Sequence, residues 1–268
     1  MQHIMVAHDL SDHAWLALQR AALLAAQHGA RLTVLHVQEE HLPKQVLEHN
    51  REAARELIGG QLEQLGLAGA ELVIVTGRPV QKMVAQQKAR SVDLLVMGDH
   101  HQESPLYFSG TTLERVLQRS TAAVLLVVDA QLAPYRQALV PMDFSRCACN
   151  ALHKTRALLA ADASIHAVHV LEQAQVHGCS TDEHEWQAGL FAQLVADEQA
   201  KMPAGGAAIS QALLHGELHD CLSAAIEAYR PQLLALGKHG RGVLADALLG
   251  SLAQYFLENP PCDVLLVR

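Results

Sequence analysis

The sequence has few aromatic residues, and it lacks both a long hydrophobic run and a block of basic residues. Phe, Trp and Tyr make up 4% of the 268 residues, whereas hydrophobic residues as a whole make up 50%. No apolar stretch reaches the roughly 18–20 residues that a membrane-spanning helix needs, so we expect no membrane segment. Lys and Arg total 20 against 28 acidic residues, and the net charge of −8 disfavours nucleic acid as a partner.

Cysteine is also scarce. Five cysteines, an odd number in a chain of this length, do not indicate a disulfide framework. The first ten residues, MQHIMVAHDL, lack the basic region and hydrophobic core of a secretion signal. Together these two features predict a cytoplasmic protein. The apolar content is enough for one large domain or two of ordinary size.

The chain contains an internal duplication. Five segments of the first half return in the same order in the second, namely MVAHDLS as LVPMDFS, TVLHV as HAVHV, VTGRPV as LLHGEL, DLLVMG as QLLALG and AVLLVV as DVLLVR. A repeat of about 130 residues has the size of a domain. We therefore predict two domains, 1–130 and 136–268, with a linker over 129–137.

Within each repeat, short apolar runs alternate with longer amphipathic segments. Runs such as LLVMG and VLLVV are apolar at every position, as in parallel strands that helices cover on both faces. A helical pattern spans about 43–65 and ends near Gly66, and Ser180-x-x-Glu183 predicts a capping box before a helix that runs to about 200. The expected fold class is α/β, with two tandem doubly wound domains built from parallel sheets.

Four glycines fall within LGKHGRGVLADALLGS, residues 236–251, between two apolar runs. Gly237 ends the expected strand LLAL, and Gly250 precedes an expected helix that begins at Ser251. Ligands of parallel sheets bind at the carboxyl ends of the strands, where a helix N-terminus offers unpaired N–H groups to an anion. Gly237 and Gly240 would let backbone amides approach a phosphate, and the Ser251 hydroxyl adds a donor. The alternative is that these are turn glycines without a ligand.

The spacing Gly237-x2-Gly240-x9-Gly250-Ser251 resembles the G-2x-G-9x-G-(S/T) motif of the ATP-binding members of the universal stress protein family. ALVPMDFS resembles the first strand and turn of that family, AVHV its second strand and NPPCDVLLVR its last. Both halves of the chain take part, so the sequence is similar to a tandem universal stress protein. The resemblance implies a five-stranded parallel sheet in each half, of the adenine nucleotide alpha hydrolase type. It also implies ATP, or AMP or ADP, as the ligand, with Mg²⁺ as an accompanying ion.

The same resemblance places the nucleotide in the second half. The base would lie by Asp143, with its neighbours Pro141 and Met142, and by Val170. The remaining residues of the expected site, of which the glycines and the serine would hold ribose and phosphates, are Leu236, Gly237, His239, Gly240, Gly250, Ser251 and Leu252. An Asx turn or N-cap role for Asp143 stays open beside the base contact. Ala253 stands where ATP-binding members often carry a second hydroxyl.

The first half departs from the motif. It keeps Asp9 and Val37, but in MGDHHQESPLYFSGTT His101 stands in place of the second glycine and the loop is one residue short. A Cβ at the point where backbone must contact phosphate blocks the approach, and Asp99 adds negative charge. We predict that this half keeps the fold, with a degenerate nucleotide loop, and binds no ATP.

Three functions remain open. The favoured one is a nucleotide-binding stress-response or regulatory protein that is not an enzyme, with no catalytic residue assigned. A slow ATPase or another nucleotide-using enzyme is the second, although the SGGxDS and HIGH signatures of related enzymes are absent. The third is metal binding through the seventeen histidines, but neither CxxC…CxxC nor HExxH occurs, so no metal ligand is assigned.

The last strand of each half, AVLLVV and DVLLVR, bears on assembly. In the related fold this strand lies at the sheet edge, and an apolar edge strand needs a cover. Single-domain relatives pair through it, so we expect the two halves to form an internal pseudo-dimer. Whether the full chain also forms a homodimer stays open, as do the stress signal and the protein partner.

Overall fold

Two units that follow the sequence repeat make up the chain. A computed structural model describes residues 1–99, 112–172, 181–238 and 249–268. It divides into unit 1, Met1–Leu132, and unit 2, Ala133–Arg268. The boundary falls inside the segment that the sequence marks as a linker.

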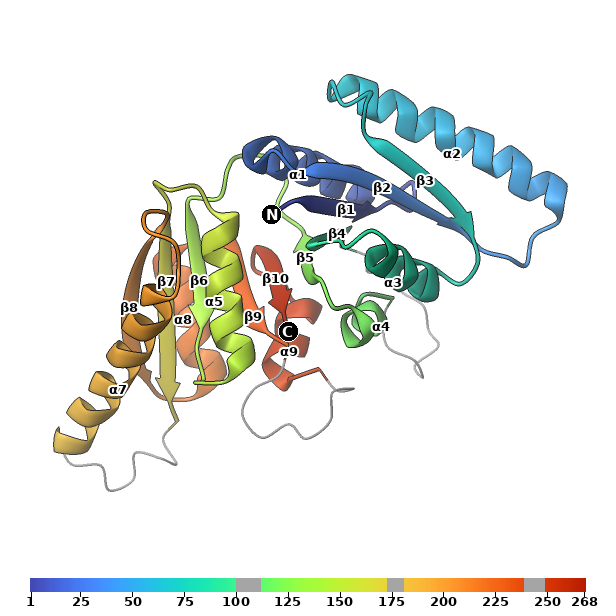
Figure 1. Cartoon of the computed structure of the whole chain (residues 1–268). Coiled ribbons are helices and arrows are strands. Elements are labelled where there is room, and N and C mark those ends of the chain that lie inside the picture. The colour runs from blue at the N-terminus through green and yellow to red at the C-terminus, as the bar shows by residue number, and fades with distance from the viewer. Residues whose placement is uncertain (100–111, 173–180, 239–248) are drawn as a thin grey trace. The chain divides into compact units, whose positions relative to one another are not determined.

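Unit 1 alternates strands and helices along the chain (Figure 1). Its elements are β1 (His3–Ala7), α1 (Asp12–His28), β2 (Arg31–Gln38), α2 (Lys44–Gln64), β3 (Glu71–Thr76), α3 (Pro79–Ala89), β4 (Leu94–Gly98), α4 (Thr112–Arg119) and β5 (Ala123–Val127). The strands pair in parallel in the order β3-β2-β1-β4-β5. Because the chain builds outward from β1 to β3 and then crosses back to β4, the strand order reverses between β1 and β4.

Unit 2 repeats this topology. Its elements are β6 (Gln137–Pro141), α5 (Arg146–Leu158), β7 (Ser164–Leu171), α7 (Thr181–Ala200), β8 (Ala208–His215), α8 (Leu218–Tyr229), β9 (Leu233–Gly237), α9 (Ser251–Glu258) and β10 (Asp263–Val267). The parallel order is β10-β9-β6-β7-β8, so the reversal lies between β6 and β9. The predicted α/β class and the five-stranded parallel sheet of each half are confirmed.

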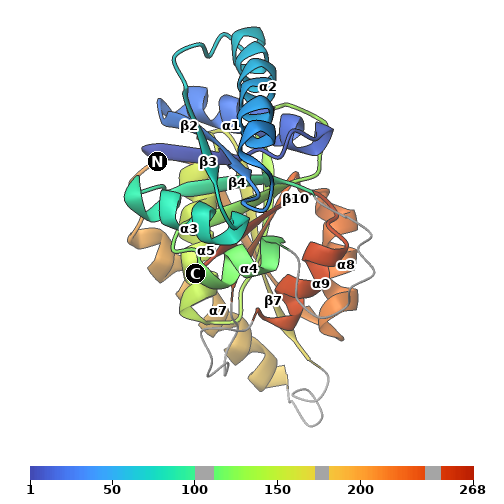
Figure 2. The same cartoon turned by 90° about the vertical axis from the view of Figure 1, so that its right-hand side faces the viewer.

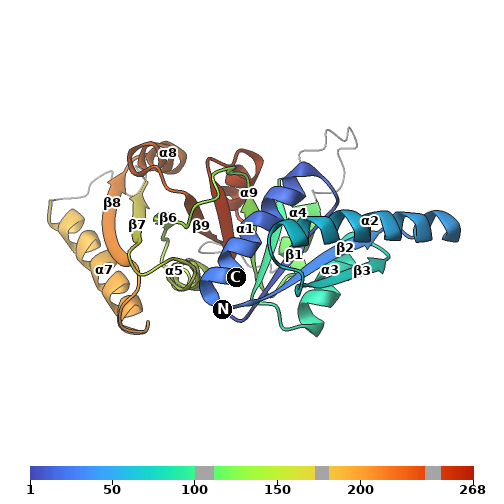
Figure 3. The same cartoon turned by 90° about the horizontal axis from the view of Figure 1, so that it is seen from above.

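Helices cover both faces of each sheet, and this explains the continuous apolar runs. Figure 3 shows α5 and α8 on opposite faces of the sheet of unit 2. Figure 2 shows α3 and α4 of unit 1 side by side, where the two helices pack together. The inner strands β4 and β9 are accordingly buried at their first four positions, as strands with two covered faces should be.

The structure agrees with the expected helix ends, but it assigns the last residues of the predicted linker to unit 2. Helix α2 ends at Gln64, one residue before the predicted limit, and Gly66 follows with a left-handed φ of 68°. Helix α7 ends at Ala200, whereas Ser180 of the predicted capping box lies outside the described residues. Strand β6 begins at Gln137, and the buried Tyr135 hydroxyl hydrogen-bonds Asp263. The end of the predicted linker is therefore fixed within unit 2.

Candidate functional site

A cavity of about 790 Å³ lies at the carboxyl ends of β6, β7 and β9 in unit 2. The predicted site residues that line it are Pro141, Met142, Asp143, Val170, Leu236, Gly237, Gly250, Ser251 and Leu252. The other two, His239 and Gly240, lie outside the described residues. The cavity sits where the strand order reverses, which is the usual ligand position in open α/β sheets.

The start of α9 presents unpaired backbone donors to this cavity. Gly250 is the N-cap residue, in an extended conformation (φ −63°, ψ 147°), and no side chain caps the helix. No described residue accepts a hydrogen bond from the N–H of Ser251, Leu252 or Ala253, and all three residues line the cavity. The Gly250 N–H donates to the Lys238 carbonyl at 3.1 Å, which joins the two ends of the loop. An uncapped helix N-terminus of this kind favours an anion.

Asp143 takes the structural role and also lines the cavity. Its Oδ1 accepts a hydrogen bond from the Ser145 N–H at 3.0 Å, which is an Asx turn. Ser145 in turn caps α5, since its hydroxyl oxygen accepts from the Ala148 N–H at 3.2 Å. The two alternatives left open by the sequence are therefore compatible, because the turn holds the carboxylate at the cavity wall.

Gly237 has a packing role that the sequence reasoning missed. A Cβ at this position would lie 2.8 Å from the Ala148 nitrogen and 2.9 Å from the Cys147 carbonyl carbon. In unit 1 a Cβ at Gly98 would lie 2.3 Å from the His13 carbonyl oxygen. Both contacts are with backbone at the start of the helix that follows the first strand. Glycine here lets helix and strand end approach closely, whether or not a ligand binds.

Aromatic side chains form a wall of the cavity that the sequence reasoning did not include. The Phe144 ring meets the His169 ring edge to face, with centroids 4.9 Å apart at 88°. His169 donates from Nδ1 to the Met142 carbonyl at 2.6 Å. Trp186 of α7 also lines the cavity and is 59% exposed. Phe144 could have been found from its place in the repeated turn, but no sequence signal connects α7 to these strand ends.

Unit 1 has a smaller pocket at the equivalent strand ends. It measures about 260 Å³, and its lining includes Asp9, Val37 and Asp99. His8 also lines it, in the position that Met142 takes in unit 2. Burial lowers the pKa of His8 to about 4, although the nearby Asp9 carboxylate acts in the opposite direction. The histidine of the predicted degenerate loop, His101, lies outside the described residues.

Metal-ligand and thiol chemistry find little support in the described part of the chain. Within it, no group of three or more His, Cys, Asp or Glu side chains could hold a metal ion. His36, one of the histidines in the apolar strand pattern, is buried and donates from Nδ1 to the His8 carbonyl at 2.7 Å. The four cysteines that the structure describes are free thiols. No described helix is long and apolar enough to cross a membrane.

Comparison with known proteins identifies the family. The model of the universal stress protein family matches the chain twice, over residues 1–128 and 134–268. A universal stress protein from Thermus aquaticus is 29% identical over 132 residues, which are 46% of this chain and 96% of the relative.

Solved structures extend the likeness to the whole chain. A universal stress protein from Archaeoglobus fulgidus shares 18% identity with a TM-score of 0.75, over 99% of this chain and 98% of that one. A second structure, described as a universal stress protein from Pseudomonas aeruginosa, shares 17% identity with a TM-score of 0.69, over 100% and 93%. At this identity the structures show a common fold. With the family model matched in each half, the chain belongs to the universal stress protein family, as a tandem member.

Proposed function

We propose that the protein binds an adenine nucleotide, ATP or its di- or monophosphate, in unit 2 and serves as a stress-response or regulatory protein rather than as an enzyme. The observation that carries this proposal is the uncapped N-terminus of α9, which meets the 790 Å³ cavity at the switch point of the sheet. The positive end of the helix dipole and three N–H groups that have no acceptor among the described residues suit a phosphate group.

The other cavity walls suit the base and ribose. Asp143 can accept a hydrogen bond from an exocyclic amine or a ribose hydroxyl, and Val170 supplies an apolar surface beside it. Phe144 and His169 add aromatic surface at the same strand ends. Such a wall, apolar with few polar groups, is typical of small-molecule sites.

The charge of the cavity makes Mg²⁺ part of the proposal. Its described lining includes two carboxylates, Asp143 and Glu172, and no Lys or Arg side chain. Among the described residues a triphosphate would therefore meet no positive charge other than the helix end, and a bound Mg²⁺ would offset part of the repulsion from the two carboxylates. We expect ATP to bind more tightly with Mg²⁺ than without it, and AMP to depend on the ion much less.

Nucleotide analysis of the purified protein is the direct test. The protein is purified without heating, denatured and chromatographed, and it is then titrated with labelled ATP in the presence of Mg²⁺. We expect adenine nucleotide at up to about one molecule per chain, and phosphate release no faster than a slow background. No binding at millimolar ATP would contradict the proposal, and rapid turnover would support the ATPase alternative instead.

Assembly stays a prediction. Strands β5 and β10 each stand at one end of the strand order of their own unit, which is where the sequence reasoning expects a covered edge. We propose that the two edges cover each other as an internal pseudo-dimer. Expression of residues 133–268 alone tests this idea, because the exposed edge should cause dimerisation or aggregation. A soluble, monomeric fragment would contradict it.

A further inference from the structure

An arginine joins two segments of unit 2 at the end of the sheet opposite the nucleotide cavity. Arg156 of α5 reaches the loop between α7 and β8, where its guanidinium donates to three backbone carbonyls. Nη1 donates to Pro203 at 3.1 Å, Nε donates to Ala207 at 3.3 Å, and Nη2 donates to Gly205. One fork-shaped side chain thus satisfies three acceptors of one loop.

Unit 1 has a loop at the matching place, 65–70, and no arginine on α1 at the position of Arg156. Gly66, after α2, matches Gly205, after α7, and both take left-handed φ values, 68° and 79°. The strand register agrees, because Glu71 pairs with Thr33 as Ser210 pairs with His166. Counted from the serine caps of α1 and α5, the position of Arg156 is occupied in unit 1 by alanine, Ala22.

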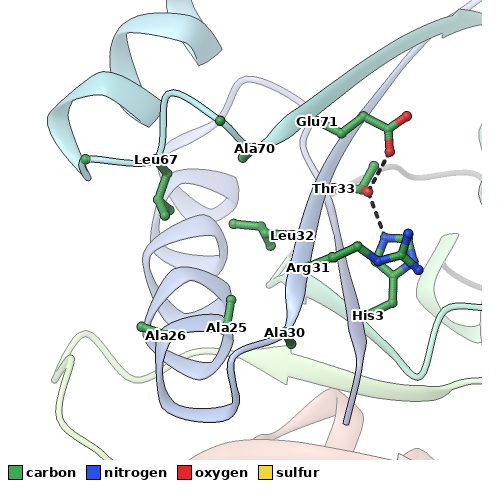
Figure 4. A pocket seen from close by; sticks show the side chains of 12 residues that line it. His3, Ala25, Ala26, Ala30, Arg31, Leu32, Thr33, Leu67, Ala70 and Glu71 are labelled. Carbon is green, nitrogen blue, oxygen red and sulfur yellow. Dashed lines mark hydrogen bonds between the residues drawn. The ribbon is translucent and has the colours of Figure 1, made fainter.

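A cavity of about 480 Å³ occupies this region of unit 1 (Figure 4). Its apolar part is formed by α1, β2 and the loop after α2, through Ala25, Ala26, Leu32, Leu67 and Ala70. Gly66 and Gly69 also line it, and no described residue donates a hydrogen bond to either of their carbonyl oxygens. Of the two, Gly66 matches Gly205, whose carbonyl is one of the three that Arg156 satisfies in unit 2.

Three polar side chains at the other end of the cavity, His3, Thr33 and Glu71, already have partners. Figure 4 shows His3, Thr33 and Glu71 together, with Thr33 between the other two. His3 bonds Thr33 at 2.8 Å, Thr33 donates to Glu71 at 3.0 Å, and Glu71 pairs with Arg90 at 3.0 Å. The charged side chains of the lining are Glu71 and Arg31, and Arg31 lies beside His3, away from Leu67. The acceptors that no described residue satisfies are thus the carbonyl oxygens of Gly66 and Gly69 in the loop.

We propose that this groove of unit 1 binds an arginine side chain of a partner polypeptide. The guanidinium donates to the carbonyls of the loop 65–70, as Arg156 does within unit 2, and the aliphatic stem lies on Leu32 and Leu67. The site faces the amino ends of the strands, so it is independent of the proposed nucleotide site.

The test uses the full chain and three small probes. N-acetyl-arginine amide is titrated into ¹⁵N-labelled protein, next to the lysine amide and the neutral, nearly isosteric citrulline amide. We expect the arginine probe to shift the amide signals of 65–70 at millimolar concentration, with the other two at least about tenfold weaker. Absence of these shifts overturns the proposal. Equal binding of the lysine probe overturns it as well, because charge alone would then explain the contact.

Two matched variants sharpen the test. Ala22→Arg should fill the groove from within the chain and abolish the shifts at 65–70. Arg156→Ala should open the counterpart groove, so that the arginine probe now also shifts the signals of 201–207. If Arg156→Ala gains no second site while the wild-type groove binds the probe, the equivalence of the two grooves is wrong and the proposal fails. Should Ala22→Arg not fold, the three-probe comparison on the wild-type chain and the Arg156→Ala result still decide.

Discussion

Unit 1 and unit 2 carry the same turn after their first strand. Asp9 and Asp143 each accept a hydrogen bond at 3.0 Å from the N–H of the serine two residues later. Leu10 and Phe144, between them, take left-handed φ values of 74° and 64°, which are uncommon for such residues. The serines cap α1 and α5 at the same distance, 3.2 Å. The duplicated halves have thus kept the backbone geometry that the fold needs.

What differs is the side chains around the strand ends. The cavity of unit 2 has about three times the volume of the pocket in unit 1, 790 against 260 Å³. Where unit 2 has Met142, unit 1 has a buried histidine, His8, and its pocket includes Asp99 besides the aspartate and the glutamate that both cavities contain. The comparison teaches that the turn and its glycine serve the fold in both units, whereas the size and lining of the cavity at the strand ends differ between them.

The opposite ends of the sheets differ too. In unit 1 a chain of hydrogen bonds runs from the buried His3 through Thr33 to Glu71. In unit 2 the counterpart of Thr33 is His166, which stacks on Tyr229 with ring centroids 4.0 Å apart and 18° between planes. His166 also hydrogen-bonds the exposed Ser210 at 2.7 Å, so the hydrogen bonds of unit 1 involve a buried histidine and that of unit 2 an exposed serine, and mutations can compare the two.

The largest expected effect comes from the shared glycine. Gly98→Ala should destabilise unit 1 by about 3 kcal/mol or more, because the new Cβ meets the backbone of α1 at 2.3 Å. Gly237→Ala, at 2.8 Å, should cost unit 2 between about 1 and 3 kcal/mol. Urea denaturation with hydrogen exchange assigns each loss to its unit. If both variants keep wild-type stability, glycine is not retained for packing.

His8→Met, which copies unit 2 into unit 1, should change the acid stability. Burial lowers the pKa of His8 to about 4 in the folded protein, against 6.5 for an ordinary histidine. The unfolded chain therefore binds the proton first, and stability present above pH 6.5 is lost as the pH falls toward 4. At pH 4 the wild type should have lost about 2 to 3 kcal/mol of its free energy of unfolding through this histidine, and the variant should not show this loss.

Stability is measured by urea denaturation between pH 4 and pH 7. The matched control is His41→Met, since His41 has a side chain that is 67% exposed and should leave the curve unchanged. If His8→Met shows the same acid loss as the wild type, the buried histidine is not its source.

The smallest effect is expected for the hydrogen-bond chain at the amino ends. Thr33→Val is nearly isosteric but leaves Nε2 of the buried His3 without its partner, so it should cost about 2 kcal/mol. Ser210→Ala removes the exposed partner of His166 and should cost less than about 0.5 kcal/mol. Thermal denaturation measures the stability of both variants. Equal losses of stability would show that the two units do not differ in the weight of these hydrogen bonds.

The sequence predicts the fold well because its signals are local and occur twice. Continuous apolar runs indicate covered parallel strands, and the repeated order of motifs indicates that both units share one topology, whose five strands the family resemblance implies. The sequence also predicts that Asp143, Gly250 and Ser251 lie around one cavity, because it places them at a strand end and at a helix start on the same edge of the sheet. The contact of Gly237 with α5 and the approach of Trp186 to the cavity did not, because each depends on how distant elements pack.

The most direct test of the account is a calorimetric titration of Mg²⁺-ATP into the wild type and two matched variants. Ser251→Glu places a carboxylate at the start of α9, where it favours the helix but repels phosphate, and Thr112→Glu does the same at α4 of unit 1. We predict about one site per chain in the wild type and in Thr112→Glu, and at least about 100-fold weaker binding in Ser251→Glu. Two equivalent sites, or binding lost in Thr112→Glu and kept in Ser251→Glu, would contradict the assignment of the nucleotide to unit 2.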